Sequence, residues 1–437
     1  MGYSIERLGE APDNMKRRVL SQKDAIRGFM ERYEERGVSP PPEVEKPTYE
    51  VVGKIERYDQ RDQPTARAYL MPGSVEYDEY YSRHPELKEW DDENRRRRAK
   101  QEEEWVQIDP IGSQFGPSVF YSRRVLGLPE IVEGKVAARH QVDIKGRVNA
   151  DPLAVAQIIK SYARYLGASK VRITRLNQDW VYTNYAHPYT LEPYGKPVEL
   201  NYKYIVCMAF PQNRMLMASG DGIAEYLEVG WIYTYASLVS VIIAQFIRSL
   251  GWQARGLTSE NSAYLVVPTF VDAGVGEQGR CSYVVTKEFG NNFRPGAVAT
   301  DMPLAVDKPV DFRLQDFCQK CKICAEACPS GAIPTGDKQV VRGVRIWYFD
   351  GNKCRRYWDT IGHPCGICQY VCPWNFPNYR FHNIVRELAQ RSSLMRTLAI
   401  KGHHLFYGDF QRGPQPEWIM RNTEALTKTT REESNNK

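Results

Sequence analysis

The chain has 437 residues, of which 42% are hydrophobic, and it carries 59 basic and 53 acidic side chains for a net charge of +6. A chain of this length can bury a sizeable core and is expected to form two or three domains. The near balance of charge argues against a nucleic-acid partner. The longest charge run, residues 91–104, mixes both signs, as a solvated helix or linker does.

Residues 1–140 are predicted to form an N-terminal region that wraps around the core of the protein and has no hydrophobic core of its own. The region is polar, and its prolines at positions 40–42 and 47 predict irregular chain. Residues 1–20 are charged and contain no apolar segment, so they do not resemble a signal peptide.

Residues 141–305 are predicted to form an α/β core of mixed elements. Its central helix is expected at Val229 to Leu250. The first 19 residues of this segment carry no charge, which approaches the length of a membrane span. Their tyrosine, threonine, serine and glutamine content favours a helix buried in a soluble core. The other predicted elements are a helix at 152–165, ended by Gly167, and strands at 170–174, 203–210 and 264–270.

A glycine-rich segment, Gly274 to Arg280, follows the last of these strands. Its spacing is similar to the dinucleotide-binding fingerprint, but no helical pattern follows it, so a Rossmann site is not predicted. Glycines here would let a ligand approach the backbone closely. Cys207 lies in an apolar run and Cys281 lies just before another, so both are predicted to pack in the core.

Eight of the ten cysteines lie between residues 318 and 372. The first four follow C-x2-C-x2-C-x3-C-P, the spacing of bacterial ferredoxins, and the next four follow C-x10-C-x2-C-x3-C-P. In such pairs the fourth cysteine of each run ligates the cluster of the other run. One [4Fe–4S] cluster is therefore predicted on Cys318, Cys321, Cys324 and Cys372, and a second on Cys354, Cys365, Cys368 and Cys328.

Zinc sites and disulfides are the alternatives for these cysteines. Zinc sites usually pair two C-x2-C units and do not need a triple spacing with a trailing proline, so clusters are favoured. The cluster domain is predicted to span residues 306–378. A C-terminal extension, residues 379–437, is expected to hold a helix, an aromatic patch at 403–407 and a polar tail.

Three short motifs precede the cysteines: Gly276-Glu277-Gln278-Gly279-Arg280, Arg294-Pro295-Gly296 and Thr300-Asp301-Met302-Pro303-Leu304. Together with the paired cluster motifs and the widened second run, this order resembles the corrinoid-dependent reductive dehalogenases over roughly residues 140–378. Epoxyqueuosine reductase shares much of the same arrangement. The chain departs from the usual family pattern at Cys281, Ser282 and Pro295.

The resemblance implies an α+β fold, in which a nitroreductase-like α/β core that binds a corrinoid precedes a ferredoxin-like domain with two [4Fe–4S] clusters. The corrinoid would be a cobamide in its base-off form, without a protein imidazole as lower ligand. The implied activity is reductive dehalogenation, in which hydrogen replaces a halogen of a small organohalide. Two electrons from an external donor would pass through the clusters to the cobamide.

The resemblance also implies roles for individual residues. Tyr235 maps to the proton donor, Arg294 to the basic residue that assists it, and Asn261 to a polar partner for the substrate. Tyr233, two residues away, is expected to point to another side of the helix.

Further residues are expected around the cofactor. The resemblance places Gly276, Gly279 and Arg280 at the corrinoid. Tyr357 and Trp358 lie in the widened gap of the second cysteine run. Both are large and amphipathic, so at least one is expected to line the cavity above the cobalt.

Two other functions fit parts of the sequence: an epoxyqueuosine reductase that modifies tRNA, and a non-catalytic iron–sulfur electron-transfer subunit. The balanced charge, the long N-terminal region and the lack of a helical-repeat tail argue against the first.

The absence of a twin-arginine signal fits either the mature form of an exported protein or a cytoplasmic member. We favour the mature form because no fused flavin reductase domain is present. This hypothesis predicts a peripheral protein on the outer face of the cytoplasmic membrane, with a small integral-membrane anchor protein as partner.

Overall fold

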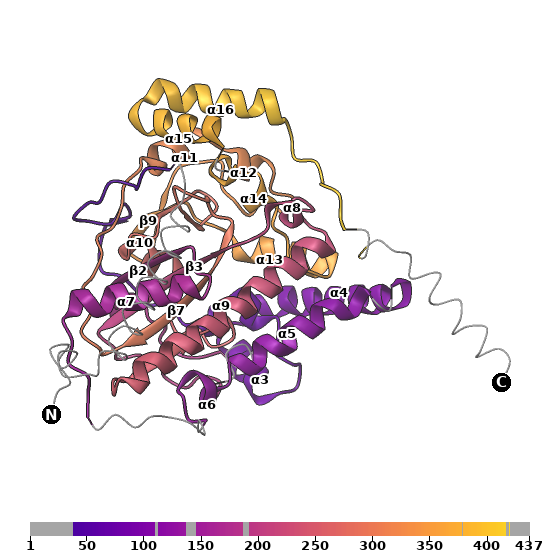
Figure 1. The fold of residues 1–437 in the computed structure, drawn as a ribbon. Coiled ribbons are helices and arrows are strands. Elements are labelled where there is room, and N and C mark those ends of the chain that lie inside the picture. Colours follow the sequence, from indigo (N-terminus) through magenta and orange to yellow (C-terminus); the bar gives the residue numbers. More distant parts are fainter. Residues whose placement is uncertain are drawn as a thin grey trace.

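The computed structural model describes residues 38–109, 112–136, 146–186, 192–377, 379–416 and 419. At its centre is an antiparallel four-stranded sheet in the order β2-β3-β7-β4 (Figure 1). The strands are β2 (Lys170–Arg175), β3 (Tyr204–Pro211), β7 (Phe293–Thr300) and β4 (Ala254–Leu257). The predicted strands at 170–174 and 203–210 are confirmed.

Both faces of this sheet are buried, and strand β3 shows why. Ile205, Cys207 and Ala209 join the apolar cluster on one face, and Val206, Met208 and Phe210 join the cluster on the other. A strand sends successive side chains to opposite faces, so a continuous apolar run serves two cores. The second cluster is covered by α7 (Pro152–Tyr165) and α9 (Ile223–Ser249), and the first includes residues of α10 (Val266–Asp272).

The predicted strand at 264–270 is wrong, because most of it is helix α10. Pro268 falls in the first turn of that helix, where backbone N–H groups have no intrahelical partner in any case. The predicted central helix is present, but α9 begins at Ile223, after Gly222, and is longer than expected.

Helix α9 is the one helix in the described ranges that is long and apolar enough to cross a membrane by length and composition. Half of its most apolar window is buried against the rest of the protein, and buried core helices pass the same test.

The N-terminal region is irregular around its prolines at positions 40–42 and 47, as predicted, but largely helical after them, which was not predicted. Its long helices are α3 (Val75–Arg83), α4 (Pro85–Ile108) and α5 (Phe115–Leu126); its short elements are β1 (Glu50–Val51), η2 (Gln60–Asp62), α2 (Pro64–Arg67), η3 (Gly112–Gln114) and α6 (Pro129–Val132). Helix α5 packs on α9, and α4 packs on α13 (Gly351–Ile361). The region also contacts the cluster domain, which lies far along the chain, because β1 pairs with β9 (Val344–Ile346).

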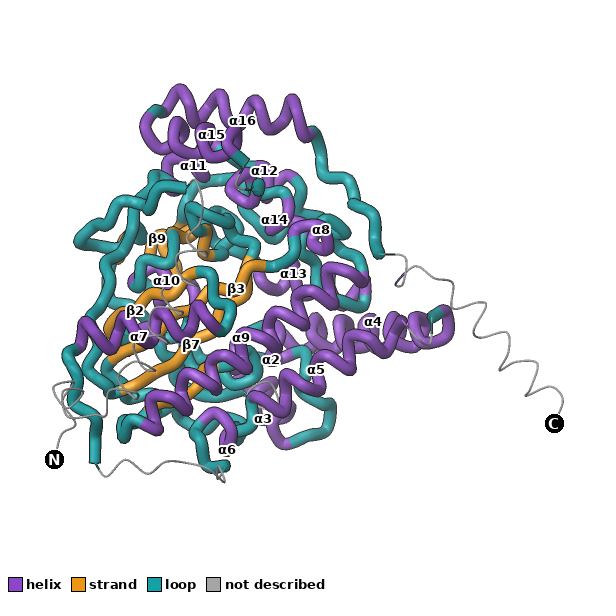
Figure 2. Tube along the Cα trace, viewed as in Figure 1, coloured by secondary structure: helices purple, strands orange, loops and turns teal. Residues whose placement is uncertain are grey.

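Short elements joined by long loops carry the cysteines (Figure 2). They are α11 (Leu314–Lys320), α12 (Ile323–Glu326), β8 (Gln339–Val341), β9, α13, α14 (Ile367–Tyr370) and η5 (Pro373–Asn375). The remaining short elements of the core are η4 (Gln178–Trp180), α8 (Arg214–Met217), β5 (Glu277–Gln278) and β6 (Val284–Val285). After the cysteines come two helices, not one: α15 (Arg380–Arg391) and α16 (Ser393–Tyr407), which contains the predicted aromatic patch.

Candidate active site

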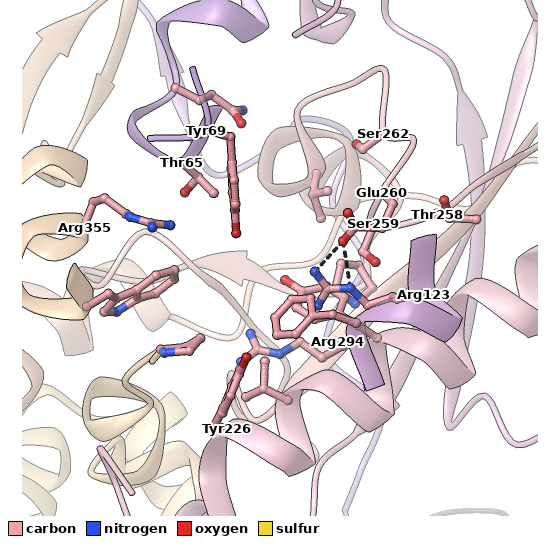
Figure 3. Close-up of a pocket in the computed structure, with 18 of the residues that line it drawn as sticks. Thr65, Tyr69, Arg123, Tyr226, Thr258, Ser259, Glu260, Ser262, Arg294 and Arg355 are labelled. Atoms are coloured by element: carbon pink, nitrogen blue, oxygen red, sulfur yellow. Dashed lines mark hydrogen bonds and ion pairs between the residues drawn. The ribbon is translucent and has the colours of Figure 1, made fainter. Parts of the chain in front are cut away.

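A cavity of about 680 Å³ lies where the N-terminal helices, the core and the cluster domain meet. Figure 3 shows Arg123 of α5, Tyr226 of α9, Arg294 of β7 and Arg355 of α13 converging on it from different elements. Its walls mix tyrosines, aliphatic residues of α10 and several arginines, so the site offers an apolar surface with a few placed charges. Cavities of this size and lining are typical of small-molecule and cofactor sites.

One face of α9 forms part of the wall. Glu225, Val229 and Tyr233 follow each other at intervals of four residues, and all three line the cavity. Residues spaced in this way lie on the same side of a helix.

The structure reverses the expected positions of the two tyrosines. Tyr233 lines the cavity, whereas Tyr235 lies about 200° further round the helix. The hydroxyl of Tyr235 donates to the Leu166 carbonyl at 2.6 Å, and its ring packs on Phe210 and Trp231. The four-residue repeat from Glu225 is the sequence signal that identifies Tyr233.

Two guanidinium groups flank Tyr233. The Cζ atoms of Arg294 and Arg123 lie 4.9 Å and 5.2 Å from the centre of the Tyr233 ring. Arg123 is also ion-paired with Glu260, which offsets part of its charge. Arg294 is therefore the cation with the stronger net field at this tyrosine.

Arg294 is almost fully buried and is tied to the cluster domain. Strand register places it opposite Phe210, and its Nη2 donates to Gln369 Oε1 at 2.9 Å. Burial tends to lower the pKa of Arg294, but Tyr233, Tyr283 and Glu225 raise it, and the net pKa lies above its usual value. The side chain therefore stays charged, and Gln369 from the second cysteine run fixes its orientation.

Glu225 is a buried carboxyl group that the sequence did not point out. Burial raises the pKa of Glu225 to about 8, although Arg294 lowers it in part. The group is therefore mostly protonated at neutral pH and can donate a hydrogen bond into the cavity.

Asn261 is not among the described residues that line the cavity, contrary to the expected substrate contact. Its amide accepts from Arg255 and donates to the Gly127 carbonyl, both at 2.9 Å, so both ends are used in packing. Thr258 and Ser259, on the same turn, face the cavity instead.

The Gly-Glu-x-Gly-Arg segment also has a different place from the expected one, since none of its described residues lines the cavity. Arg280 is 1% exposed and donates to the carbonyls of Cys318, Pro334 and Gly336 at 2.8–3.0 Å. Its guanidinium also lies 4.8 Å from the Trp347 ring centre. Arg280 thus holds the loop of the first cysteine run.

The two glycines of this segment permit close backbone contact. A Cβ atom at Gly276 would lie 2.2 Å from the Val285 carbonyl oxygen, and one at Gly279 would lie 2.8 Å from Val285 Cγ2. Between them, Glu277 accepts hydrogen bonds from the backbone of Phe312 and Leu314, at the start of α11. The whole segment therefore joins the core to the first cluster loop.

Helix α13 fills the ten-residue gap of the second cysteine run and supplies another wall. Arg355, Trp358 and Asp359 line the cavity, and Arg355 pairs with Asp359 at 2.7 Å. Of the two aromatic residues expected near the cofactor, Trp358 is the one that lines this cavity. Tyr357 points elsewhere and donates to Asp221 at 2.7 Å.

The structure gathers the eight clustered cysteines in the domain beside the cavity. Burial, and then the thiols of Cys281, Cys318 and Cys321, raise the pKa of Cys372. Burial, and then Cys328, raise the pKa of Cys354 to about 12. The fourth cysteine of each run therefore lies near members of the other run. Of the eight, Cys365 lines the cavity.

Cys281 and Cys207 are both buried in apolar clusters, as predicted. The surroundings of Cys281 were not foreseen. The small apolar cluster that contains it packs against Cys324, Cys328 and Cys368, and Asn291 Nδ2 lies 3.2 Å from its Sγ. A ninth thiol therefore lies among cysteines assigned to both clusters.

Several buried polar atoms on the cavity wall have no hydrogen-bond partner in the described part of the chain. They are both carboxyl oxygens of Glu225, Thr258 Oγ1, Ser259 Oγ, Arg294 Nε and Trp358 Nε1. Buried polar groups normally have hydrogen-bond partners. These atoms could therefore bind a large ligand that carries many polar groups, such as the amide side chains around the rim of a cobamide.

A family model described as a 4Fe-4S dicluster domain matches residues 317–376. The tetrachloroethene reductive dehalogenase of Sulfurospirillum multivorans is 30% identical over 282 residues, which cover 57% of this chain and 56% of that protein. Epoxyqueuosine reductase of Salmonella typhimurium is 32% identical over 122 residues, or 26% of this chain.

A solved reductive dehalogenase structure, described as suggesting a mechanism for B12-dependent dehalogenation, matches with a TM-score of 0.67 and 27% identity. The match covers 85% of this chain and 49% of that one. The chain thus spans about half the length of these dehalogenases. In sequence and in fold, it is related to the reductive dehalogenases.

Proposed function

We propose that this protein is a reductive dehalogenase, which converts R–X, two electrons and a proton into R–H and a halide ion. The observation that carries the proposal is that Tyr233, Arg294 and Cys365 line the same cavity. It places a phenolic proton source, a buried cation and a cysteine of the second run around one space. The names of the related proteins support the same reaction class.

In this proposal two [4Fe–4S] clusters occupy the crossed cysteine sets. Cys318, Cys321, Cys324 and Cys372 hold one cluster, and Cys354, Cys365, Cys368 and Cys328 hold the other. The second set would be nearer the cavity, because Cys365 lines it and α13 carries Cys354.

A cobamide in the cavity, on a nitroreductase-like core, would supply the low-valent cobalt that removes the halogen. We expect the unpartnered side-chain groups of Thr258, Ser259 and Trp358 to form hydrogen bonds with the amide groups at the rim of such a cofactor.

The residues around the cavity can then donate the proton, stabilise the developing charge and exclude water. Tyr233 holds the proton on its phenolic oxygen and releases it to the carbon that loses the halogen. Arg294, fixed by Gln369, stabilises the negative charge that develops on that oxygen. Trp358 and the aliphatic residues of α10 keep water away from the reacting groups.

The proposal is tested with protein purified without oxygen and loaded with iron, sulfide and a cobamide. Halide release is measured from chlorinated ethenes, alkanes and phenols with a reduced viologen as external donor. Dehalogenation of at least one class, together with a corrinoid absorbance band, is expected. A fully loaded protein that binds corrinoid yet releases halide from none of them would overturn the reaction. A protein that takes up clusters but no corrinoid would indicate an electron-transfer subunit.

Cluster content provides the first prediction. Iron and acid-labile sulfide should each approach about eight per chain, as two cubanes require. Cys372→Ala should damage the cluster on Cys318, Cys321 and Cys324 and leave the other spectroscopically intact. Electron paramagnetic resonance of the reduced protein distinguishes the two clusters. Loss of the Cys354 cluster with survival of the other would refute the crossed assignment.

The next prediction concerns substrate choice. Trp358→Ala removes a large side chain from the wall and so enlarges the cavity. It should change the relative rates of dehalogenation of ethenes and phenols, since such pockets select substrates mainly by shape and burial. Tyr357→Ala is the control on the same helix, because its hydroxyl is bonded to Asp221. An identical substrate profile for Trp358→Ala, with normal iron content, would show that this tryptophan serves packing alone.

Partners and location form part of the same proposal. The electrons would come from an external donor, and a small integral-membrane anchor protein would hold the enzyme on the outer face of the cytoplasmic membrane. Co-purification from detergent-solubilised membranes would test the anchor.

A further inference from the structure

The two C-terminal helices carry an unusual density of exposed apolar side chains. Of the 29 large apolar residues exposed in the described structure, nine fall between residues 379 and 407. Six of them follow one side of each helix and form what we call the α15–α16 face: Phe381, Ile384, Leu388, Leu394, Leu398 and Leu405. The aromatic residues Tyr379, Phe406 and Tyr407 lie at the helix ends. Single exposed apolar residues are normal, but a concentration of this kind marks an interaction site.

The face follows from helical spacing. Leu394, Leu398 and Leu405 recur at intervals of four and seven residues along α16 and form one stripe, while Phe381, Ile384 and Leu388 form a similar stripe on α15. The helices pack together, and His382 near the start of α15 meets Tyr407 at the end of α16. In Figure 1, α16 forms the upper edge of the molecule with α15 beside it.

The exposed charges on the two helices themselves have one sign. Arg380, Arg391 and Lys401 are exposed, and none of them makes a salt bridge with another described residue. The acidic residue on the two helices, Glu387, is half-buried and paired with Lys287. An apolar stripe with aromatic ends and a basic border is the pattern of helices that lie in the surface of an anionic bilayer. A second copy of the chain would bring like charges together.

We propose that the α15–α16 face binds directly to an anionic lipid bilayer. The proposal is independent of the reaction and of any anchor protein. It gives the molecule a defined orientation, because α16 packs on α11, where Lys320 donates to Ser393 and Thr397. Helix α11 carries Cys318, so the first cluster loop would lie toward the membrane, and no described residue of α15 or α16 lines the cavity.

The proposal is tested by sedimentation of the holoprotein with vesicles. The vesicles contain either phosphatidylcholine alone or equal parts of phosphatidylcholine and phosphatidylglycerol. We expect binding to the mixed vesicles, weaker binding at high salt and little binding to pure phosphatidylcholine. The variant Leu398→Glu/Leu405→Glu should lose binding by about tenfold or more, because each leucine would otherwise be buried among acyl chains.

Ile108→Glu is the matched control, because Ile108 is 80% exposed, close to the 79% of Leu405, but lies at the end of α4. It should bind like the unaltered protein. Iron content and the thermal midpoint establish that each variant is folded. Equal binding by the leucine variant, or no binding to mixed vesicles, would overturn the proposal. A concentration-dependent dimer that the leucine variant abolishes would also overturn it, since a second copy would then cover the face.

Discussion

Tyr233→Phe is expected to lower dehalogenation turnover by about 10²–10⁴-fold, the usual contribution of a positioned general acid. The substitution removes one hydroxyl and keeps the ring that packs between Arg294 and Arg123. Cluster content, corrinoid uptake and thermal midpoint should therefore be unchanged. Single-turnover measurements of product formation report on the proton-transfer step itself.

Tyr235→Phe is the matched control on the same helix. Its hydroxyl donates to the Leu166 carbonyl, so its loss should cost about 0.5–1.5 kcal/mol of stability and leave turnover near normal. If Tyr235→Phe is inactive and Tyr233→Phe active, the wrong tyrosine has been assigned. If both remain active, the proton comes from another group, for which protonated Glu225 on the cavity wall is the next candidate to replace.

Arg280→Met is expected to empty the cluster on Cys318, Cys321, Cys324 and Cys372, so that iron falls from about eight to about four per chain. Methionine keeps much of the side-chain volume and removes every donor. The Cys321 carbonyl would then lie buried without its donor, at about 1–3 kcal/mol, and the part-buried carbonyls of Cys318 and Pro334 would lose theirs as well. The loop that presents the thiols should therefore loosen.

Arg345→Met is the control, because Arg345 is a half-buried arginine on β9, with 41% of its side chain exposed, that pairs with exposed Glu50. Exposed pairs of this type contribute little, so iron content and stability should stay normal. Full iron content in Arg280→Met would show that the cysteines hold their cluster without the hydrogen bonds from Arg280. Normal iron but lost corrinoid would restore the expectation that Arg280 contacts the cofactor.

Patterns that depend on local geometry could be predicted from the sequence. The alternating strand β2, the continuously apolar strand β3 and the periodic helix α7 appear where expected, because side-chain period and backbone period are properties of a few neighbouring residues. The cysteine spacing indicated clusters for a similar reason, since three thiolates from one tight loop must follow a fixed interval. The strand predicted at 264–270 was wrong because a short apolar run does not distinguish a strand from a buried helix such as α10.

The sequence by itself determined the dicluster region, helices α7 and α9, strands β2 and β3, and the resemblance to reductive dehalogenases. Only the tertiary structure decided which side chains share the cavity. Tyr233 and Tyr235 are two tyrosines of the same helix, and the structure shows that Tyr233 lines the cavity. Arg280 was expected to contact the cofactor, but its side chain binds backbone carbonyls of the first cysteine run. The physical reason is that a site is assembled from α5, α9, β7 and α13, far apart in the chain. Which face of each element turns inward depends on how those elements pack.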